Sequence, residues 1–303
     1  MSVKFENQVA IVTGAGNGLG RSHALALAAR GAKVVVNDFG GARDGSGGST
    51  AAADAVVQLI KDNGGEAIAN AANVANYDDV QAMVKQTMDT WGRVDLLVNN
   101  AGILRDKTFA KMDLKDFDIV MDVHLKGSVN CTKAVWEIMR EQNYGRIVMT
   151  TSSSGLYGNF GQSNYGAAKM AVVGFMNTLV LEGAKYNIHV NALAPAAATR
   201  MTDDLGSSEA DLALMTPEAV TAGLLTLCHE AAPTKVILCA GAGGYAATRI
   251  YETDGIYLPP SEQTPEAIIA QWDQVLAPEG QSLIDTGIAQ SMKFLSKAKS
   301  FDH

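Results

Sequence analysis

Short apolar segments alternate with longer helical patterns along most of this chain of 303 residues. Residues 34–36 are three valines in a row, the unbroken apolar run of a strand buried on both faces of a sheet. Strands are predicted at 9–13, 33–37, 67–70, 96–98, 146–150, 189–193 and 236–239. Helices are predicted at 19–30, 50–63, 78–91, 114–142 and 162–186. The alternation predicts an α/β fold with a doubly wound parallel sheet of the Rossmann kind.

Two stretches interrupt this alternation. Residues 39–49 form a glycine-rich segment, which is either a flexible surface loop or a loop that folds over bound adenosine. From about residue 246 the rhythm is lost, although Thr264 and Pro265 ahead of Glu266 predict a helix start and residues 281–299 a last helix. We therefore expect a sheet domain at 1–245. A C-terminal helical extension at 246–303 would pack on that domain or on a partner subunit.

A glycine-rich turn between the first strand and the first helix predicts a dinucleotide site. Glycines let the backbone approach a pyrophosphate closely, and the helix N-terminus adds free N–H groups and a positive dipole end. A tight turn without a ligand is the plainer alternative. The candidate cofactor-binding residues here are Gly14, Gly16, Asn17, Gly18, Leu19 and Gly20.

Polar residues at other strand ends complete the predicted cofactor site. Asp38 ends the second strand, where a carboxylate accepts hydrogen bonds from an adenine ribose and repels the 2′-phosphate of NADP. NAD is therefore expected, although Arg43 in the glycine-rich loop could reach that phosphate. Asn73 and Val74 follow the third strand, where Asn73 either contacts the adenine or is only a polar strand end. Asn100, Ala101 and Gly102 follow the fourth strand, in a cofactor site or a structural turn.

Tyr165 and Lys169 stand four residues apart, on one face if the segment is helical. A tyrosine titrates near ~10 unaided, too high for acid–base work at neutral pH. An ammonium ~4 Å away at an effective dielectric of ~20 would lower that pKa by roughly three units. The pair therefore predicts a tyrosine that exchanges a proton with a substrate.

These motifs, in this order, resemble the short-chain dehydrogenase/reductase family over about residues 5–245. The resemblance rests on 13–20, 99–102, Ser152 and 165–169. Within that family, segments 35–41, 100–106, 155–162 and 227–230 look like the (3R)-hydroxyacyl-CoA dehydrogenase domain of peroxisomal multifunctional enzyme type 2. The resemblance implies that Tyr165 exchanges the proton, that Lys169 lowers its pKa and bonds the nicotinamide ribose, and that Ser152 aligns the substrate oxygen. Ser153 is the alternative to Ser152.

Two positions depart from the common family pattern. His124 stands where many members carry an asparagine that supports a proton-relay water. It could hold that water as a catalytic residue, bond a backbone carbonyl, or be a buried structural histidine. Pro195 is followed by alanine instead of the common glycine, and the segment still implies a nicotinamide pocket in which Pro195 and Thr199 contact the cofactor.

The composition of the chain limits the kinds of partner that it is expected to bind. The net charge of −8 argues against nucleic acid or an anionic membrane, and no apolar stretch is read as membrane-spanning. Three unclustered cysteines and an N-terminus without the apolar core of a signal peptide favour a reducing cytoplasm and no metal site. The helix at 162–186 is apolar almost all round, which predicts a partner subunit on its outer side in a homodimer or homotetramer.

The predicted function is NAD-dependent hydride transfer between a secondary alcohol and a ketone, with a (3R)-hydroxyacyl-CoA thioester favoured by the resemblance. A hydroxysteroid dehydrogenase and a 3-oxoacyl-carrier-protein reductase are the alternatives within the family. A non-catalytic NAD-sensing protein is the alternative from another class. The tail is expected to help close the substrate site, so truncation after Tyr245 should raise KM more for a long acyl substrate than for a short alcohol.

Overall fold

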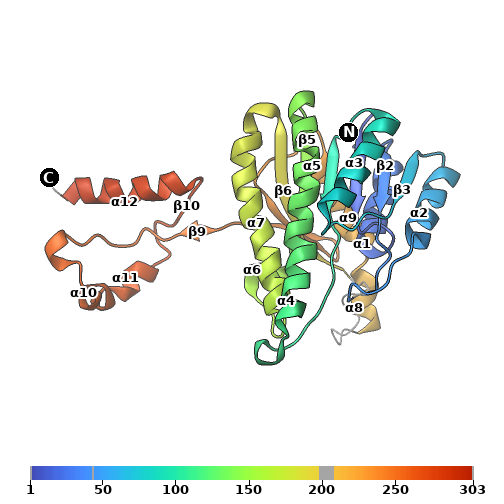
Figure 1. Ribbon diagram of the computed structural model, residues 1–303. Coiled ribbons are helices and arrows are strands. Elements are labelled where there is room, and N and C mark those ends of the chain that lie inside the picture. Colours follow the sequence, from blue (N-terminus) through green and yellow to red (C-terminus); the bar gives the residue numbers. More distant parts are fainter. Residues whose placement is uncertain (1, 43, 198–207, 302–303) are drawn as a thin grey trace. The chain divides into compact units, whose positions relative to one another are not determined.

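The structure is a computed structural model that describes residues 2–42, 44–197 and 208–301. By its internal contacts the chain divides into two compact units, Met1–Ala247 and Thr248–His303, coloured blue to orange and orange to red in Figure 1.

The first unit is built on one eight-stranded sheet with the strand order β3-β2-β1-β4-β5-β6-β7-β8. Every paired strand from β1 to β7 runs parallel to its neighbour. β8 follows β7 after two residues, Ala242 and Gly243, both with positive φ, so it returns antiparallel in a hairpin. The strands are β1 Val9–Thr13, β2 Lys33–Asn37, β3 Ala67–Asn70, β4 Leu96–Asn99, β5 Gly145–Thr150, β6 Ile188–Ala196, β7 Ile237–Gly241 and β8 Gly244–Thr248.

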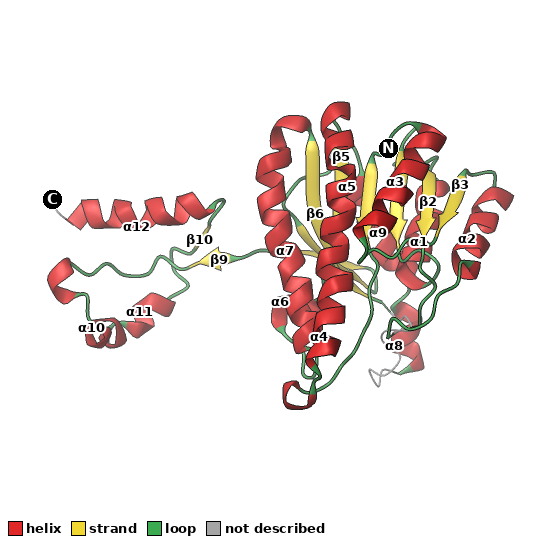
Figure 2. Ribbon diagram, viewed as in Figure 1, coloured by secondary structure: helices red, strands yellow, loops and turns green. Residues whose placement is uncertain are grey.

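Helices cover both faces of this sheet (Figure 2). Successive residues of β1 serve the two faces: Ala10 and Val12 belong to one apolar cluster with α1 and α9, and Ile11 to another with α3, α5 and α7. The predicted doubly wound α/β fold is confirmed. The helices are α1 Gly18–Ala28, α2 Ala51–Asp62, α3 Tyr77–Trp91, α4 Leu114–Met121, α5 Gly127–Gln142, α6 Ser153–Tyr157, α7 Ser163–Gly183, α8 Glu209–Leu214 and α9 Pro217–Cys228.

Two local features of this unit differ from the sequence expectation. The single helix expected over 114–142 is interrupted by a π-helical turn, Asp122–Lys126, between α4 and α5. Residues 153–157 form the short helix α6, which the apolar periodicity does not reveal because a helix of five residues is only one turn and a half long. The remaining predicted helices and strands begin and end within about four residues of the observed ones.

Two stretches are long and apolar enough to cross a membrane by length and composition alone: Ser163–Tyr186 and Ala210–Cys228. The expectation that no stretch reaches spanning length is therefore wrong on that criterion. Val172, Val173 and Met176 of the first stretch pack in the core under the sheet, and the second is divided between α8 and α9. Burial in the doubly wound core accounts for only part of this apolar composition, since less than half of each stretch is buried.

The C-terminal unit combines short helices with one small antiparallel pair of strands, β9 Tyr251–Glu252 and β10 Ser282–Leu283. The predicted helix start is confirmed, because the Thr264 hydroxyl caps α10 Pro265–Ala270 by accepting from the Ala267 N–H at 3.2 Å. The last helix, α12 Gly287–Phe301, starts six residues later than predicted, since residues 282–283 pair with β9. No side chain described between residues 248 and 300 is fully buried. The remaining elements are η4 Pro260–Glu262 and α11 Trp272–Leu276.

Candidate active site

The turn between β1 and α1 lies at the point where the strand order reverses, since β1 is flanked by β2 on one side and β4 on the other. Ligands of doubly wound sheets bind at the carboxyl ends of strands at such a reversal. Gly14 has φ 62°, a left-handed conformation that favours glycine. A Cβ on Gly20 would lie 2.1 Å from the Gly14 carbonyl oxygen, so the turn and the start of α1 fit together only without side chains there.

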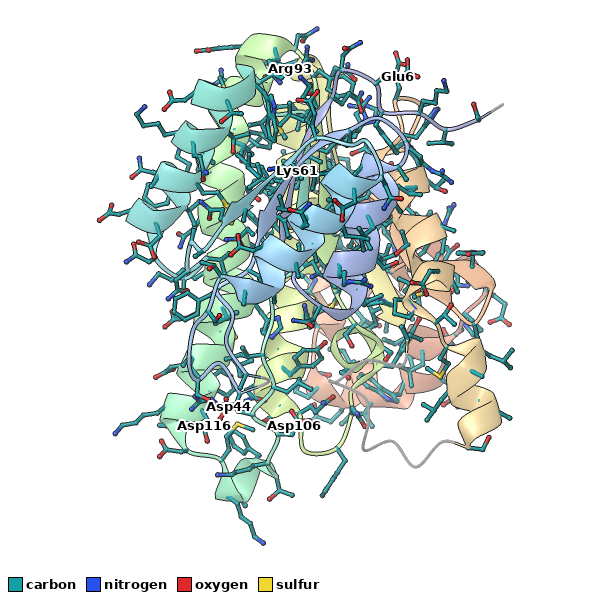
Figure 3. All side chains as sticks on the ribbon, turned by 90° about the vertical axis from the view of Figure 1, so that its right-hand side faces the viewer. Glu6, Asp44, Lys61, Arg93, Asp106 and Asp116 are labelled. Atoms are coloured by element: carbon teal, nitrogen blue, oxygen red, sulfur yellow. The ribbon has the colours of Figure 1, made fainter. Side chains whose placement is uncertain are left out.

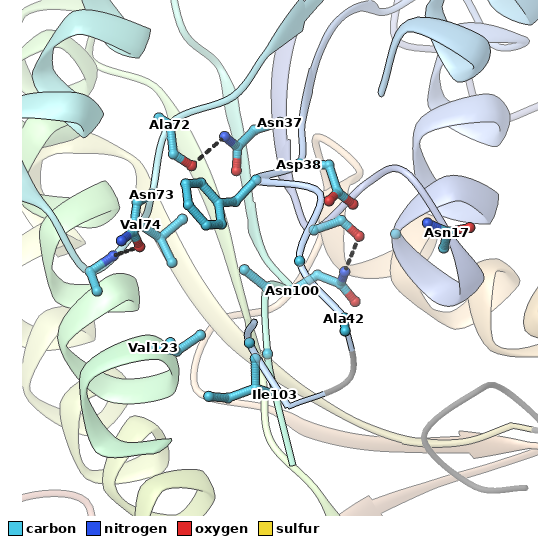
Figure 4. Close-up of a pocket in the computed structure, with 18 of the residues that line it drawn as sticks. Asn17, Asn37, Asp38, Ala42, Ala72, Asn73, Val74, Asn100, Ile103 and Val123 are labelled. Atoms are coloured by element: carbon cyan, nitrogen blue, oxygen red, sulfur yellow. Dashed lines mark hydrogen bonds between the residues drawn. The ribbon is translucent and has the colours of Figure 1, made fainter. Parts of the chain in front are cut away.

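Asn100 fixes this turn from the neighbouring strand. Its side-chain amide donates to the carbonyl oxygens of Thr13 and Gly14 at 2.9 and 3.1 Å. The Thr13 hydroxyl in return accepts from the N–H groups of Asn100 and Ala101, both at 3.0 Å. The structural alternative for Asn100 is therefore confirmed, and Asn100 also borders a pocket (Figure 4).

Asp38 joins the glycine turn to the glycine-rich loop. One carboxylate oxygen accepts from the Gly16 N–H and the other from the Gly40 N–H, both at 2.7 Å. Each carboxylate oxygen can accept a second hydrogen bond, so Asp38 keeps acceptor capacity for ribose hydroxyls. Position 16 requires a residue without a side chain, because a Cβ on Gly16 would lie 2.7 Å from the Asp38 carboxylate.

The glycine-rich loop is folded and borders the pocket. Phe39 closes it through a carbonyl that accepts from the Ser49 N–H at 3.1 Å, and Ala42 and Ser46 bond across it at 2.7 Å. Phe39, Gly41, Ala42 and Gly45 line the pocket, as a loop that covers adenosine would. Arg43 lies outside the described residues.

The pocket has a volume of about 410 Å³ and is bordered by most of the predicted cofactor residues (Figure 4). Its polar side chains are few and its walls are largely backbone and apolar groups, as small-molecule sites commonly are. Gly16, Tyr165, Lys169 and Pro195 are predicted residues that do not border it. The lining includes Gly14, Asn17, Gly18, Leu19, Gly20, Asp38, Asn73, Val74, Asn100, Ala101 and Gly102, and, beyond the prediction, Asn37, Ile103, Ile119, Asp122 and Val123.

Asn73 has a structural role as well as a place in the pocket wall. Its side-chain oxygen accepts from the Ala75 N–H at 3.0 Å, and its carbonyl accepts from the Asn76 N–H. This turn leads into α3, whose N-terminus Asn76 caps. The side chain therefore shapes the pocket edge.

Ser152 and Tyr165 meet at the carboxyl end of β5. Ser152 is buried and is the N-cap of α6, where its hydroxyl accepts from the Ser154 N–H at 3.2 Å. The same hydroxyl lies beside the Tyr165 phenol and lowers the pKa of that phenol. The structure thus brings together Ser152 and Tyr165. Ser153 lies one residue further on as an exposed first residue of α6.

Lys169 lies one helical turn beyond Tyr165 in α7 and is 4% exposed. Its amine donates to the Thr150 carbonyl at 2.6 Å and lies 5.5 Å from the centre of the Tyr165 ring. Burial without a carboxylate partner disfavours the charged amine and lowers the pKa of Lys169 to about 7.

The expected depression of the Tyr165 pKa by Lys169 is not found. Burial raises the pKa of Tyr165 above its ordinary value, the nearby Ser152 hydroxyl lowers it in part, and the charge of Asp106 raises it. The Lys169 amine points to the Thr150 carbonyl, and its burial favours the neutral form of the amine. Lys169 therefore supplies less positive charge to the phenol than the sequence spacing suggests.

His124 is buried on the π-helical turn and contacts Tyr165 edge to face, with ring centres 5.1 Å apart. Its Nε2 lies 2.8 Å from the Ile103 carbonyl oxygen and 3.1 Å from the Ile103 N–H. The backbone-bonding alternative for His124 is thus confirmed. Desolvation lowers its pKa well below the usual range, so the ring is neutral, and the buried Nδ1 lacks a partner among the described residues. Gly102 makes room, since a Cβ there would lie 2.3 Å from the His124 ring.

The predicted nicotinamide segment is only partly described. Pro195 lies on β6, half-buried, opposite Ala240 of β7. Thr199 lies outside the described residues. A hydrogen-bonded row beside Tyr165 escaped the sequence prediction: the Ser154 hydroxyl donates to Gln162, whose amide donates to Asp106, each at 2.7 Å. A single sequence gives no signal for this row, because it joins three segments through long-range contacts.

Comparison with known proteins agrees with this geometry. The family model of the short chain dehydrogenases matches residues 8–210. The chain belongs to the short-chain dehydrogenase family. It is 50% identical over 273 residues to a Mycobacterium tuberculosis protein named as a short-chain type dehydrogenase/reductase, a match that covers 89% of this chain and 94% of that protein.

Two solved structures of this dehydrogenase family are similar. Full-length peroxisomal multifunctional enzyme type 2 of Drosophila melanogaster is 34% identical with a TM-score of 0.81, over 99% of this chain and 51% of that one. The chain thus spans about half the length of that relative and is related to its dehydrogenase domain. A 7α-hydroxysteroid dehydrogenase in complex with NADH and 7-oxoglycochenodeoxycholic acid is 27% identical with a TM-score of 0.71, over 80% of this chain and 95% of that one. The family makes this protein an oxidoreductase that acts on small molecules.

Proposed function

We propose that this oxidoreductase interconverts a (3R)-hydroxyacyl-CoA and the corresponding 3-oxoacyl-CoA with NAD as its cofactor. The observation that carries the proposal is the placement of the Ser152 hydroxyl beside the half-buried Tyr165 phenol, one helical turn from Lys169. The relation to multifunctional enzyme type 2 supports the acyl-CoA substrate.

The residues at the end of the sheet fit NAD. When bound, NAD supplies the hydride acceptor or donor of the reaction. The glycine turn would hold its pyrophosphate at the N-terminus of α1, because Gly14 and Gly20 leave the backbone bare there. Asp38 would accept hydrogen bonds from the adenine ribose with the capacity that Gly16 and Gly40 leave free.

Asp38 also supports NAD over NADP. Its carboxylate borders the pocket, where it would repel a 2′-phosphate. We expect kcat/KM for NAD to exceed that for NADP by about a hundred-fold or more, equivalent to about 2.7 kcal/mol. Asp38→Ser should narrow that ratio. Equal use of both cofactors by the unaltered protein would contradict the proposal.

The protein's own side chains transfer the hydroxyl proton of the substrate and position its oxygen. In alcohol oxidation the ionised Tyr165 takes the hydroxyl proton at its phenolate oxygen, while the Ser152 hydroxyl holds the substrate oxygen in place. Lys169 would bond the nicotinamide ribose, as the family resemblance implies, with an amine now held at the Thr150 carbonyl. His124 braces the Tyr165 ring from the π-helical turn.

A substrate panel tests the proposal against its rivals. NADH formation is followed with (3R)- and (3S)-hydroxyacyl-CoA, a 7α-hydroxysteroid and a short secondary alcohol. The steroid is a second candidate because the related solved structure holds a bile acid derivative. Turnover of the steroid alone would replace the acyl-CoA proposal. Firm NAD binding without turnover of any substrate would favour a non-catalytic NAD-sensing protein. A preference for NADPH together with acyl-carrier-protein substrates would favour a 3-oxoacyl-carrier-protein reductase.

We also propose a cytoplasmic protein that works as a homodimer or homotetramer. The assembly is supported by the outer side of α7, where Met170 and Leu181 are 39% and 55% exposed. A cytoplasmic site is supported by the buried thiols of Cys131 and Cys228, which form no disulfide. Sedimentation of the purified protein and fractionation of its native cells test these two proposals, and a monomer or an organelle-bound protein would contradict them.

A further inference from the structure

Arg105 lies six residues beyond the end of β4, where its side chain bridges two segments. Its Nε donates to the Asp44 carbonyl oxygen at 2.9 Å, in the glycine-rich loop. Its Nη1 donates to the Asp116 carboxylate at 2.6 Å, in α4. The contact lowers the pKa of Asp116, so the carboxylate is charged and the bridge persists across neutral pH. Figure 3 shows Asp44 and Asp116 together at one end of the first unit.

The main chain of Arg105 is held by the residue next to Tyr165. Asn164, which is fully buried, donates through its side-chain amide to the Arg105 carbonyl at 3.0 Å and more weakly to the Asp116 carbonyl at 3.4 Å. Its side-chain oxygen accepts from the Tyr165 N–H at 2.7 Å. Three hydrogen bonds therefore connect the glycine-rich loop, Arg105, Asn164 and the backbone of Tyr165.

The residues around Arg105 make the same connection by packing. Ile103 lines the pocket, bonds His124 through its backbone, and packs where Gly45 of the loop approaches its side chain. Further along, the Lys107 N–H donates to the Gly161 carbonyl at 2.9 Å, four residues before Tyr165. Residues 103–107, named the strap from here on, thus touch the loop at one side and the Tyr165 region at the other.

We propose that Arg105 is a positioning residue that couples closure of the glycine-rich loop over the cofactor to the placement of Tyr165. The expected effect on catalysis rests on the proposed function, whereas the coupling between the loop and Tyr165 does not depend on which reaction the protein catalyses. A cofactor that holds the loop closed strengthens the Asp44–Arg105 contact and with it the strap. By linkage, a substrate that holds Tyr165 in place strengthens cofactor binding by the same factor.

Arginine suits this place because its guanidinium is planar, always charged, and presents donors in several fixed directions. The Nε and Nη1 donors reach two acceptors on different segments at once. A lysine would keep the charge at Asp116 but could not reproduce the two-directional fork. The Asp116 carboxylate fixes the position of the guanidinium. The hydrogen bond to the Asp44 carbonyl is the contact that depends on the conformation of the glycine-rich loop.

Hydrogen exchange followed by mass spectrometry tests the coupling without turnover. In the cofactor-free protein, Arg105→Met should speed exchange both in the loop peptide (39–49) and in the peptide that contains Tyr165 (161–169). NAD should slow exchange in both peptides of the unaltered protein, but only in the loop peptide of Arg105→Met. Lys107→Met is the matched control, because Lys107 also pairs with Asp116, at 3.7 Å, with its side chain 56% exposed.

Kinetics supplies the catalytic readout. At saturating NAD and substrate, Arg105→Met should lower kcat about ten- to a hundred-fold, the cost of a misplaced catalytic group. Lys107→Met should leave kcat unchanged. Arg105→Lys should be more stable to unfolding than Arg105→Met, but its kcat should be nearly as low. If Arg105→Met alters the loop peptide alone and keeps kcat, the coupling is overturned. If the exchange pattern holds while the unaltered protein oxidises no substrate, the proposed function fails and the coupling stands.

Discussion

The amine of Lys169 donates a 2.6 Å hydrogen bond to the carbonyl oxygen of Thr150. Burial of the amine lowers its pKa to about 7, against 10.5 for an ordinary lysine. The unfolded chain therefore binds more protons than the folded one between pH 7 and 10.5, so Lys169 destabilises the fold less as pH rises through that window.

Replacing Lys169 with methionine should remove this pH dependence. Between pH 7 and pH 10 the stability of the unaltered protein should rise relative to Lys169→Met, by an amount on the order of 4 kcal/mol. Urea unfolding of both proteins across this range measures the difference. A constant difference in the free energy of unfolding would show that Lys169 is not titrating near neutrality in the folded protein.

Gly20→Ala should weaken cofactor binding. The new Cβ would lie 2.1 Å from the Gly14 carbonyl oxygen and 2.5 Å from the Asn100 amide, so the turn must open. Overpacking of this kind costs about 1–3 kcal/mol, and affinity for NAD should fall at least about ten-fold. Calorimetric titration with NAD measures it. Gly287→Ala is the control, because its Cβ meets nothing within 4 Å, and unchanged affinity in Gly20→Ala would contradict a pyrophosphate site at this turn.

Asp106→Asn should make alcohol oxidation less dependent on high pH. Burial raises the pKa of Tyr165, the nearby Ser152 hydroxyl lowers it and the Asp106 charge raises it again. Removing that charge lowers the pKa, so the low-pH limb of the kcat profile should move to lower pH, by less than about one unit for an exposed group. Asp118→Asn removes another exposed carboxylate as a control. A shift toward higher pH would contradict this electrostatic account.

Gly174→Arg should separate the proposed subunits. Gly174 lies on α7 between the exposed Met170 and Leu181, and a Cβ on it would meet nothing within 4 Å in the same chain. The arginine therefore fits the isolated chain and would disturb only a partner. Sedimentation velocity should show a monomer with nearly unchanged thermal stability, whereas Gly287→Arg should remain assembled. A variant that keeps the oligomeric state of the unaltered protein would place the interface elsewhere.

The sheet and its cofactor turn could be predicted because their signals are local. Three consecutive valines mark a strand buried on both faces, and glycines between a strand and a helix mark a turn that a ligand can approach. Strands β1 to β7 and helices α1, α2 and α3 accordingly lie close to where they were expected. Asp38 was predicted at the end of β2, where its carboxylate now borders the pocket.

What the sequence could not supply are contacts between distant segments and the balance of competing effects. The four-residue spacing of Tyr165 and Lys169 shows their common face but not the Thr150 carbonyl that takes the lysine amine. Burial, which reverses the expected direction of the Tyr165 pKa, depends on the whole fold. The π-helical turn at His124 is likewise invisible to a periodicity of 3.6 residues, because it inserts one extra residue into a continuous helical pattern.

The most direct measurement compares the unaltered protein with Tyr165→Phe in a single assay of NADH formation from (3R)-hydroxyacyl-CoA, with NAD binding measured in parallel. The variant keeps the ring that His124 contacts and removes only the phenol oxygen that lies beside Ser152. We expect turnover to fall by at least about a hundred- to ten-thousand-fold, the contribution of a positioned acid–base group, with NAD affinity unchanged. A variant that retains most of its turnover would contradict the assignment of Tyr165 as the proton-exchanging residue.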